Sequence, residues 1–344
     1  MAASTTSRRA RLGRSILAAF GAALLGGSVW GGSALAQAPP DPAQTPRRDF
    51  PGGVVGLMDI TYSRLNGFRP LKLDIYRSPA ASAPRPLVLW LHGGGWAVGD
   101  QRGGGILAPA YRDWPAVLAG LAARGYVVAA ATYRFTGEAR SPAQIEDVKA
   151  AVRWLRAHAA NYGIDPQRIV VWGASAGGQL AALLGTSCGA PELEGPKARG
   201  AEASSCVQGV VDFYGPTDLS KVQAQKIPGP PSAFGDIVDM AGEYLGCELQ
   251  SCPAETVRLA NPVAFVDASD PPFLIVHGSA DTTVPPGQSV MLYDALRKAG
   301  VKAELMMVPG VAHVFQGATD ETGKAVLDRV YAFLDAVTGV KPAD

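Results

Sequence analysis

One serine in the sequence lies within a pentapeptide of glycine and alanine, a context in which a hydroxyl can act as a nucleophile. Residues 173–177 read GASAG, with Ser175 at the centre. Small neighbours let the backbone turn sharply and expose the serine between a strand and a helix. Apolar residues of a predicted strand precede it at 168–172, and residues 178–184 begin a predicted helix. A chance match in a chain rich in glycine and alanine is the alternative, and this strand–turn–helix context argues against it.

A second glycine-rich segment lies upstream, at residues 92–96. It reads HGGGW and directly follows the apolar segment 87–91. Successive glycines let backbone N–H groups approach a negatively charged oxygen closely. A plain glycine-rich turn and a phosphate-binding loop are the alternatives, but the glycine spacing differs from that of a P-loop and no Lys-Ser or Lys-Thr follows. An oxyanion loop followed by a nucleophile is the order found in enzymes of acyl transfer.

A nucleophilic serine needs a base, and two histidines follow Ser175 in the sequence, His277 and His313. Enzymes that use this pentapeptide place the acid and then the histidine after the serine. His277 ends a predicted strand and is better explained by a structural role. His313 follows the last predicted strand in a loop, from which it can reach the serine. We therefore predict that His313 is the base.

The candidate acid is Asp281, because it follows the predicted strand 273–277 and so lies at the carboxyl edge of the sheet. Active-site groups of α/β proteins collect at that edge. Asp218 is the second choice, because it follows the preceding strand. Asp267 and Asp270 precede a strand and therefore belong to the opposite edge.

The segments that must position these residues alternate between strands and helices. Short, continuously apolar segments suit the buried strands of a parallel sheet. The alternation predicts one doubly wound α/β domain with a mostly parallel sheet. The predicted strands are 71–76, 87–91, 126–131, 169–172, 207–214, 273–277 and 303–308, and the main predicted helices are 114–124, 142–161, 286–299 and 320–337.

Three other regions flank or interrupt the predicted domain, which spans residues 55–340. Residues 1–36 are typical of a signal peptide, with four arginines, an apolar stretch and an Ala-Leu-Ala cleavage site that ends at Ala36. A retained membrane anchor is the alternative, but the apolar stretch is shorter than the roughly 20 residues that a spanning helix needs. Residues 37–54 are predicted to be a proline-rich leader. Residues 219–262 are predicted to be an inserted cover region of irregular structure.

Composition and charge argue against several classes of protein. The chain has 31 basic and 30 acidic side chains, a net charge of +1, without the basic surface typical of nucleic-acid binding. We expect a secreted or periplasmic protein without stable membrane insertion. Four cysteines in an exported chain indicate disulfides, and of the three possible connectivities we prefer Cys188–Cys206 with Cys247–Cys252. The cysteine spacing matches no zinc site, so no metal is expected. The oligomeric state is left open.

The motifs together resemble those of the α/β-hydrolase serine carboxylesterases, in particular the hormone-sensitive-lipase-like branch and the bifunctional acetylxylan and feruloyl esterase branch. The resemblance covers about residues 55–338 and is carried by residues 92–96, Tyr133-Arg134, Glu146-Asp147, 173–177, 277–285 and His313. The chain departs from the lipase-like branch because it lacks a helical N-terminal cap. Any cover over the substrate therefore falls to residues 219–262.

The resemblance also implies roles for residues around the serine. Backbone N–H groups of Gly94, Gly95 and Ala176 would form the oxyanion hole. His92 and Asp147 would be structural supports.

The expected function is hydrolysis of short-chain carboxylic esters through a Ser-His-Asp triad and an acyl-enzyme, with no cofactor. Acetyl or feruloyl esters of carbohydrates are candidate substrates. Trp96, Tyr214 and Phe315 could stack against a sugar or phenolic ring, and ordinary core packing is an equal alternative. A peptidase or amidase with the same triad, and a non-catalytic binding module of the same fold, are the rival interpretations.

Overall fold

The computed structural model describes residues 44–79, 83–196, 202–230 and 232–341. Within these residues the strands are β1 (Arg47–Phe50), β2 (Val54–Ser63), β3 (Leu71–Arg77), β4 (Arg85–Leu91), β5 (Val127–Ala131), β6 (Ile164–Ala174), β7 (Gly209–Phe213), β8 (Phe273–Gly278) and β9 (Ala303–Val308). The α-helices are α1 (Trp114–Ala123), α2 (Ala143–Ala157), α3 (Ala159–Tyr162), α4 (Ala176–Thr186), α5 (Ile237–Leu245), α6 (Ala254–Ala260), α7 (Gly287–Lys298) and α8 (Asp320–Thr338). Short 3-10 turns include η4 (Leu219–Lys221), η5 (Pro262–Phe265) and η6 (His313–Phe315).

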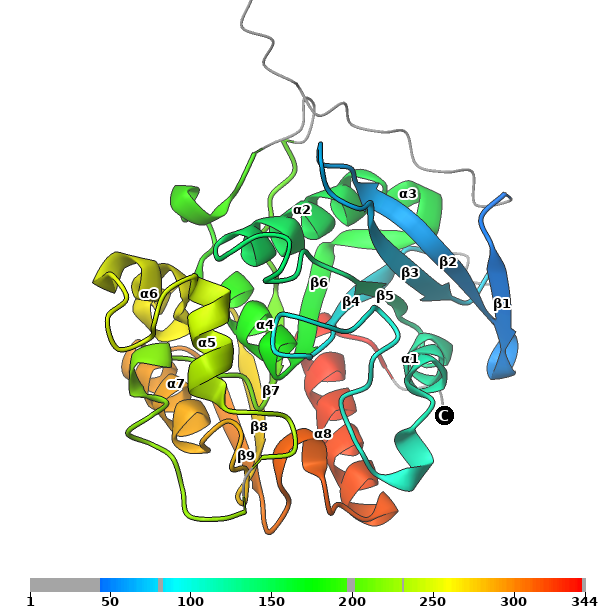
Figure 1. The fold of residues 1–344 in the computed structure, drawn as a ribbon. Helices are drawn as coiled ribbons and strands as arrows, with labels where there is room; N and C mark the ends of the chain where they lie inside the picture. The colour runs from blue at the N-terminus through cyan, green and yellow to red at the C-terminus, as the bar shows by residue number, and fades with distance from the viewer. Residues whose placement is uncertain (1–43, 80–82, 197–201, 231, 342–344) are drawn as a thin grey trace, which may run out of the picture. The chain divides into compact units, whose positions relative to one another are not determined.

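All of these strands form one sheet, in the order β1-β2-β3-β5-β4-β6-β7-β8-β9 (Figure 1). The pairs from β5 through β4 to β9 are parallel, whereas β1, β2 and β3 run antiparallel to their neighbours. The predicted doubly wound, mostly parallel α/β fold is confirmed. Because β6, β7, β8 and β9 are mutually parallel, the loops that follow them reach the same edge of the sheet.

The sheet separates two hydrophobic cores. Apolar residues of α1 and α8 pack on one face, and those of α2, α4 and α7 pack on the other. In β4 every residue from Pro86 to Leu91 is buried, as expected for a parallel strand covered on both faces. Trp90, Trp114 and Trp172 contact one another on the α1 and α8 face, with ring centroids 4.7–5.5 Å apart. Because the parallel strands are buried on both faces, the positions of their ends are fixed by the packing of both cores.

The structure corrects the extent of the predicted proline-rich leader, residues 37–54. Arg47–Phe50 forms the edge strand β1, which pairs with β2 in a register that sets Arg47 opposite Leu57. The first three residues of β1 are exposed and polar, so their sequence has no apolar signal, and pairing with the largely buried β2 makes them a strand. The predicted signal peptide lies outside the described residues.

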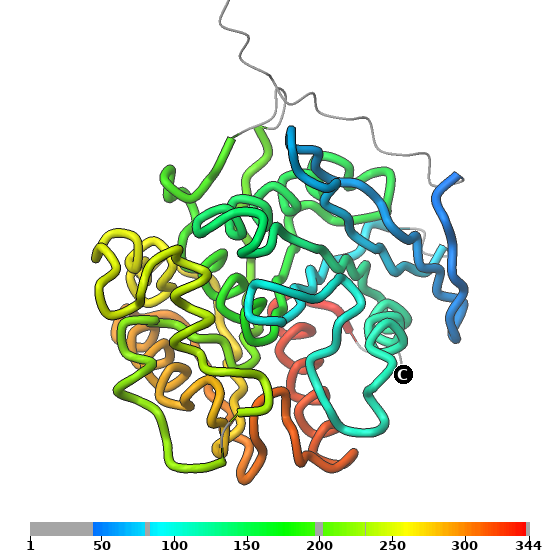
Figure 2. Tube along the Cα trace, viewed as in Figure 1, coloured from blue at the N-terminus to red at the C-terminus, as the bar shows by residue number. Residues whose placement is uncertain are grey.

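The structure also corrects the predicted irregular cover region, residues 219–262, which contains the helices α5 and α6. Asp236 caps α5 by accepting a hydrogen bond from the Val238 N–H at 2.9 Å, and Gly246 ends the helix in a left-handed conformation. Buried residues of α5 recur at helical spacing, at Ile237, Ala241, Tyr244 and Leu245. Figure 2 shows this yellow-green and yellow segment beside the orange α7, and η5 contacts α7.

Two disulfides pair the cysteines as predicted. Cys188–Cys206 follows α4, and Cys247–Cys252 links the end of α5 to the turn before α6, with Cα atoms 5.0 Å and 5.4 Å apart. No helix in the described part of the chain is both long enough and apolar enough to cross a membrane.

Candidate active site

Ser175 lies on a tight turn between β6 and α4. Its backbone has φ 54° and ψ −119°, and its N–H donates to the Phe213 carbonyl in the neighbouring β7 at 2.8 Å. Both flanking glycines are required by close packing. A Cβ at Gly173 would collide with the Gly177 carbonyl, and one at Gly177 would collide with the Leu91 carbonyl. The pentapeptide therefore holds the serine in a strained, defined conformation at the edge of the sheet.

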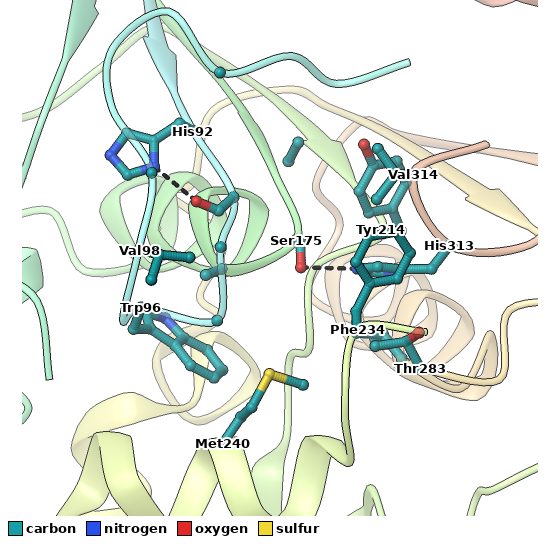
Figure 3. A pocket seen from close by; sticks show the side chains of 18 of the residues that line it. His92, Trp96, Val98, Ser175, Tyr214, Phe234, Met240, Thr283, His313 and Val314 are labelled. Atoms are coloured by element: carbon teal, nitrogen blue, oxygen red, sulfur yellow. Dashed lines mark hydrogen bonds between the residues drawn. The ribbon is translucent and has the colours of Figure 1, made fainter. Parts of the chain in front are cut away.

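The structure brings Ser175, His313 and Asp281 together in one chain of hydrogen bonds. His313 Nε2 lies 2.9 Å from Ser175 Oγ (Figure 3). His313 Nδ1 lies 2.7 Å from Asp281 Oδ2. The three residues come from the loops after β6, β8 and β9, which meet at one edge of the sheet. His313 is 4% exposed and Asp281 is fully buried. This arrangement lets the imidazole accept a proton from the serine while a carboxylate holds its other nitrogen.

Asp281 is held in its ionised form by hydrogen bonds. Its Oδ1 accepts from the backbone N–H groups of Thr283 at 2.8 Å and Val284 at 2.9 Å. Burial raises the pKa of Asp281, yet hydrogen bonds from His277 and His313 outweigh it and hold the pKa well below its ordinary value. A permanent negative charge thus faces His313.

The second-choice acid, Asp218, lies elsewhere. Its carboxylate accepts from the Ser220 N–H at 3.0 Å and from Asn261 Nδ2 at 2.8 Å, and it caps η4. It therefore organises the start of the inserted region and does not contact His313.

His277 also contacts Asp281, which the sequence did not predict. Its Nε2 lies 3.2 Å from Asp281 Oδ2, and its Nδ1 lies 2.7 Å from Ser289 Oγ. The structural role predicted for His277 thus includes a direct contact with the candidate acid, Asp281. The signal in the sequence was the spacing of four residues between His277 and Asp281. A residue at the end of a strand can contact the turn that follows it.

The loop at residues 92–96 passes directly beside the serine. A Cβ on Gly93 would lie 3.3 Å from the Ser175 Cβ. Gly94 and Gly95 have φ values of 113° and 58°, which strongly favour glycine. Both glycines and Ala176, the first residue of α4, line the same cavity as Ser175. The three predicted oxyanion residues are therefore gathered around the serine.

His92 supports this loop from within. Its ring stacks on Tyr133 with centroids 4.5 Å apart, and its Nδ1 lies 2.6 Å from the Gly93 carbonyl. Burial lowers the pKa of His92 to about 4, so the ring is neutral at pH 7 and donates to that carbonyl. The Tyr133 hydroxyl donates to the His92 carbonyl at 2.8 Å.

Two arginines form ion pairs that hold the surroundings of the loop. Arg134 Nε lies 2.8 Å from Asp147 Oδ2, which ties the segment after β5 to α2. Arg102 Nε lies 2.8 Å from the buried carboxylate of Asp74 on β3, and Arg102 also pairs with Asp59 on β2. The first contact agrees with the supporting role implied for Asp147. The second was not predicted, because nothing in the sequence indicates that the two segments meet.

The site opens into a cavity of about 280 Å³. Figure 3 shows Val98, Trp96 and the glycine loop on one side of Ser175, Phe234 and Thr283 on the side of His313, and Met240 between them. Two apolar side chains at the rim are unusually exposed, Val98 at 62% and Phe234 at 45%. Phe234 and Met240 belong to the inserted region, and neither was singled out by sequence reasoning.

The three predicted aromatic contacts are mostly used in packing. Trp96 is buried, stacks on Tyr244 with centroids 4.4 Å apart and donates to Gln179 Oε1. Tyr214 lines the cavity, but its hydroxyl donates to the Gly105 carbonyl. Phe315 does not line the cavity. It packs in the core against Phe213, 5.3 Å away, and this prediction is corrected.

No group of three or more His, Cys, Asp or Glu side chains in the described residues is arranged to hold a metal ion.

Comparison with known proteins finds a matching family model and related esterases. The BD-FAE family model matches residues 73–296. The esterase LipQ of Mycobacterium tuberculosis is 30% identical over 285 residues, which cover 82% of this chain and 62% of LipQ. The chain thus spans about three fifths of that relative's length, and 56% of the next two curated relatives.

Two solved structures are similar over nearly their whole length. One is a truncated carbohydrate esterase from gut microbiota, with a TM-score of 0.65 and 30% identity, covering 81% of this chain and 96% of the other. The other is a thermophilic esterase of Thermogutta terrifontis, with a TM-score of 0.64 and 29% identity, covering 88% and 96%. The chain therefore belongs to the BD-FAE family, within the α/β-hydrolase carboxylesterases.

Proposed function

We propose that the protein hydrolyses carboxylic esters with Ser175 as nucleophile, His313 as base and Asp281 as the acid that orients His313. The observation that supports this most directly is the hydrogen-bonded chain of the three residues beside the cavity. The names of the similar proteins, which are esterases, support the same chemistry.

The reaction proceeds in two acyl-transfer steps. His313 Nε2 takes the proton of Ser175 Oγ as that oxygen attacks the ester carbonyl carbon. The N–H groups of Gly94, Gly95 and Ala176 stabilise the resulting oxyanion. His313 then gives its proton to the leaving alcohol as the carbon–oxygen bond breaks. A water molecule, deprotonated by His313, then attacks the acyl-enzyme carbonyl carbon. His313 returns this proton to Ser175 Oγ as the bond between that oxygen and the acyl carbon breaks and the carboxylic acid leaves.

The cavity favours short acyl groups. Its volume of about 280 Å³ lies just below the roughly 300–1,000 Å³ range of small-molecule sites. The Thermogutta terrifontis esterase has been solved with butyrate and with propionate bound, and both are short acids. The similarity to a carbohydrate esterase supports a sugar ester as one substrate class. The exposed ring of Phe234, rather than Trp96 or Tyr214, is then the available surface for stacking.

We further propose export to a secreted or periplasmic location, with cleavage after Ala36. The charged start and apolar stretch of residues 1–36 support it. The two disulfides support it independently, because disulfides persist in oxidising compartments.

The test uses p-nitrophenyl esters from acetate to palmitate, a p-nitroanilide peptide series and the variant Ser175→Ala. We expect the highest kcat/KM on short esters, little amide hydrolysis, and loss of both turnover and fluorophosphonate labelling in a folded Ser175→Ala protein. A maximum at long chains would contradict the acyl preference. Faster cleavage of amides would favour a peptidase, and near-normal turnover by the variant would refute the nucleophile.

A further inference from the structure

His277 is a fully buried histidine at the end of β8 that the proposed reaction does not use. Its Nδ1 lies 2.7 Å from Ser289 Oγ on α7. Its Nε2 lies between two oxygens, the Val284 carbonyl at 3.0 Å and Asp281 Oδ2 at 3.2 Å. Both nitrogens thus have partners, and the ring does not line the cavity.

These partners assign the tautomer of His277. The Val284 carbonyl and the Asp281 carboxylate can only accept, so the proton must be on Nε2. A hydroxyl can donate, so Ser289 satisfies the lone pair on Nδ1. The network therefore fits a neutral imidazole with its proton shared between Asp281 and Val284.

With this proton, the hydrogen-bonding capacity of Asp281 is filled. An ionised carboxylate offers about four acceptor positions. Thr283 and Val284 N–H groups occupy Oδ1, and the two imidazoles of His313 and His277 occupy Oδ2. These four donors together hold the carboxylate in one orientation.

We propose that His277 is a positioning residue, which donates from Nε2 to the same Asp281 oxygen that binds His313. This inference rests on the proposed ester hydrolysis. His277 fixes the position of that oxygen, and its N–H offsets part of the negative charge of the carboxylate. Without His277, more of the charge acts on His313 and stabilises its protonated form.

The described contacts place a few other groups near His277 and His313. Asp212 on β7 is a buried carboxyl near His277, and burial raises the pKa of Asp212 to about 6. The Tyr214 ring meets His313 edge-on at 4.9 Å and His277 at 6.3 Å. Ser289 faces His277 from α7. On the cavity side, the ring of Phe234 lies 5.6 Å from that of His313. Asp281 is the only carboxylate that these described contacts place on His313.

The variant His277→Leu removes the donor and keeps a similar volume. We expect kcat on p-nitrophenyl acetate to fall about 10- to 100-fold, as for the loss of one hydrogen bond to a charged group, with KM unchanged. The acidic limb of the kcat/KM profile should move to higher pH, because His313 holds its proton more tightly. His277→Gln, whose side-chain amide reaches about as far as Nε2, should restore most of both quantities.

Val276→Ala is the matched control, since it creates a cavity in the same strand without contacting Asp281. It should lower the free energy of unfolding and leave the acidic limb in place. An unchanged limb in a folded His277→Leu protein, or a shift of equal size in Val276→Ala, would overturn the proposal.

A measurement on the unmodified protein does not depend on variant folding. Imidazole ¹⁵N NMR at pH 7 should show the His277 proton on Nε2 and none on Nδ1. A proton on Nδ1, or a charged ring, would overturn the proposal. A wild-type protein that hydrolyses no ester would instead refute the proposed function, and the NMR assignment would stand apart from that failure.

Discussion

Replacing Asp281 by asparagine tests the role of the acid, because it exchanges one carboxylate oxygen for an NH₂ group and keeps the shape of the side chain. The amide must place its oxygen and its NH₂ group among four donors. If the oxygen stays at Oδ1, it still accepts from Thr283 and Val284, and the NH₂ group then faces His313 Nδ1. That nitrogen must accept, so its proton moves to Nε2, where it points at Ser175 and can no longer take the serine proton.

The flipped amide would keep the productive tautomer but set NH₂ against two backbone N–H donors. Each unsatisfied buried donor costs about 1–3 kcal/mol, so the flip costs roughly 2–6 kcal/mol. The productive form is then depleted by about 30-fold to 10⁴-fold. The corresponding change in a serine protease lowers kcat by about 10⁴. We therefore expect Asp281→Asn to lower kcat by about 30-fold to 10⁴-fold.

Asp218→Asn is the control, because Asp218 caps η4 and does not contact His313. Its kcat/KM on p-nitrophenyl acetate should stay within about threefold of the wild type, a change smaller than one hydrogen bond. Circular dichroism of both variants establishes that they are folded. The reasoning fails if Asp218→Asn is the inactive variant, or if Asp281→Asn keeps more than a tenth of wild-type kcat.

Further predictions concern stability. Mass spectrometry of a non-reduced digest should find the cross-links Cys188–Cys206 and Cys247–Cys252, and free thiols or crossed pairs would contradict this. Glu194→Gln removes the carboxylate that pairs with buried Lys149 and Arg153 at 3.0 Å and 2.6 Å, so the free energy of unfolding in urea at pH 7 should fall by about 3–5 kcal/mol. Glu192→Gln, in an exposed pair with Arg258, should leave the urea midpoint unchanged. Burial raises the pKa of Glu194, but hydrogen bonds from Ser205 and Lys149 outweigh it and hold the pKa below 4.5. The stabilisation is therefore complete above pH 4.5 and should disappear as the pH falls through the lowered pKa. A difference that stays constant to pH 3 would contradict this assignment.

Much of the architecture could be predicted because its signals are local. Strands such as β4 are buried on both faces, so their composition alone identifies them. The turn around Ser175 needs glycine on both sides for steric reasons that act within a few residues. The order of Ser175, Asp281 and His313 along the chain then left few choices for the residues that meet.

What could not be predicted depends on contacts between distant segments. The strand β1 is polar and becomes a strand only by pairing with β2. Burial decides the role of an aromatic ring, and the sequence could not distinguish buried Phe315 from exposed Phe234. The anchor between Arg102 and Asp74 joins residues 28 positions apart. Its two segments are brought together only by the complete sheet.

The placement of the three residues after β6, β8 and β9 has a consequence for the timing of activity. His313 lies 138 residues after Ser175 in the sequence, and β9, the strand that leads to it, is at the far edge of the sheet. A growing or partly folded chain can therefore present the serine turn long before its proton acceptor arrives. Under the proposed mechanism, hydrolysis during refolding requires that β9 has paired with β8. The recovery of ester hydrolysis would then report the pairing of β9 with β8.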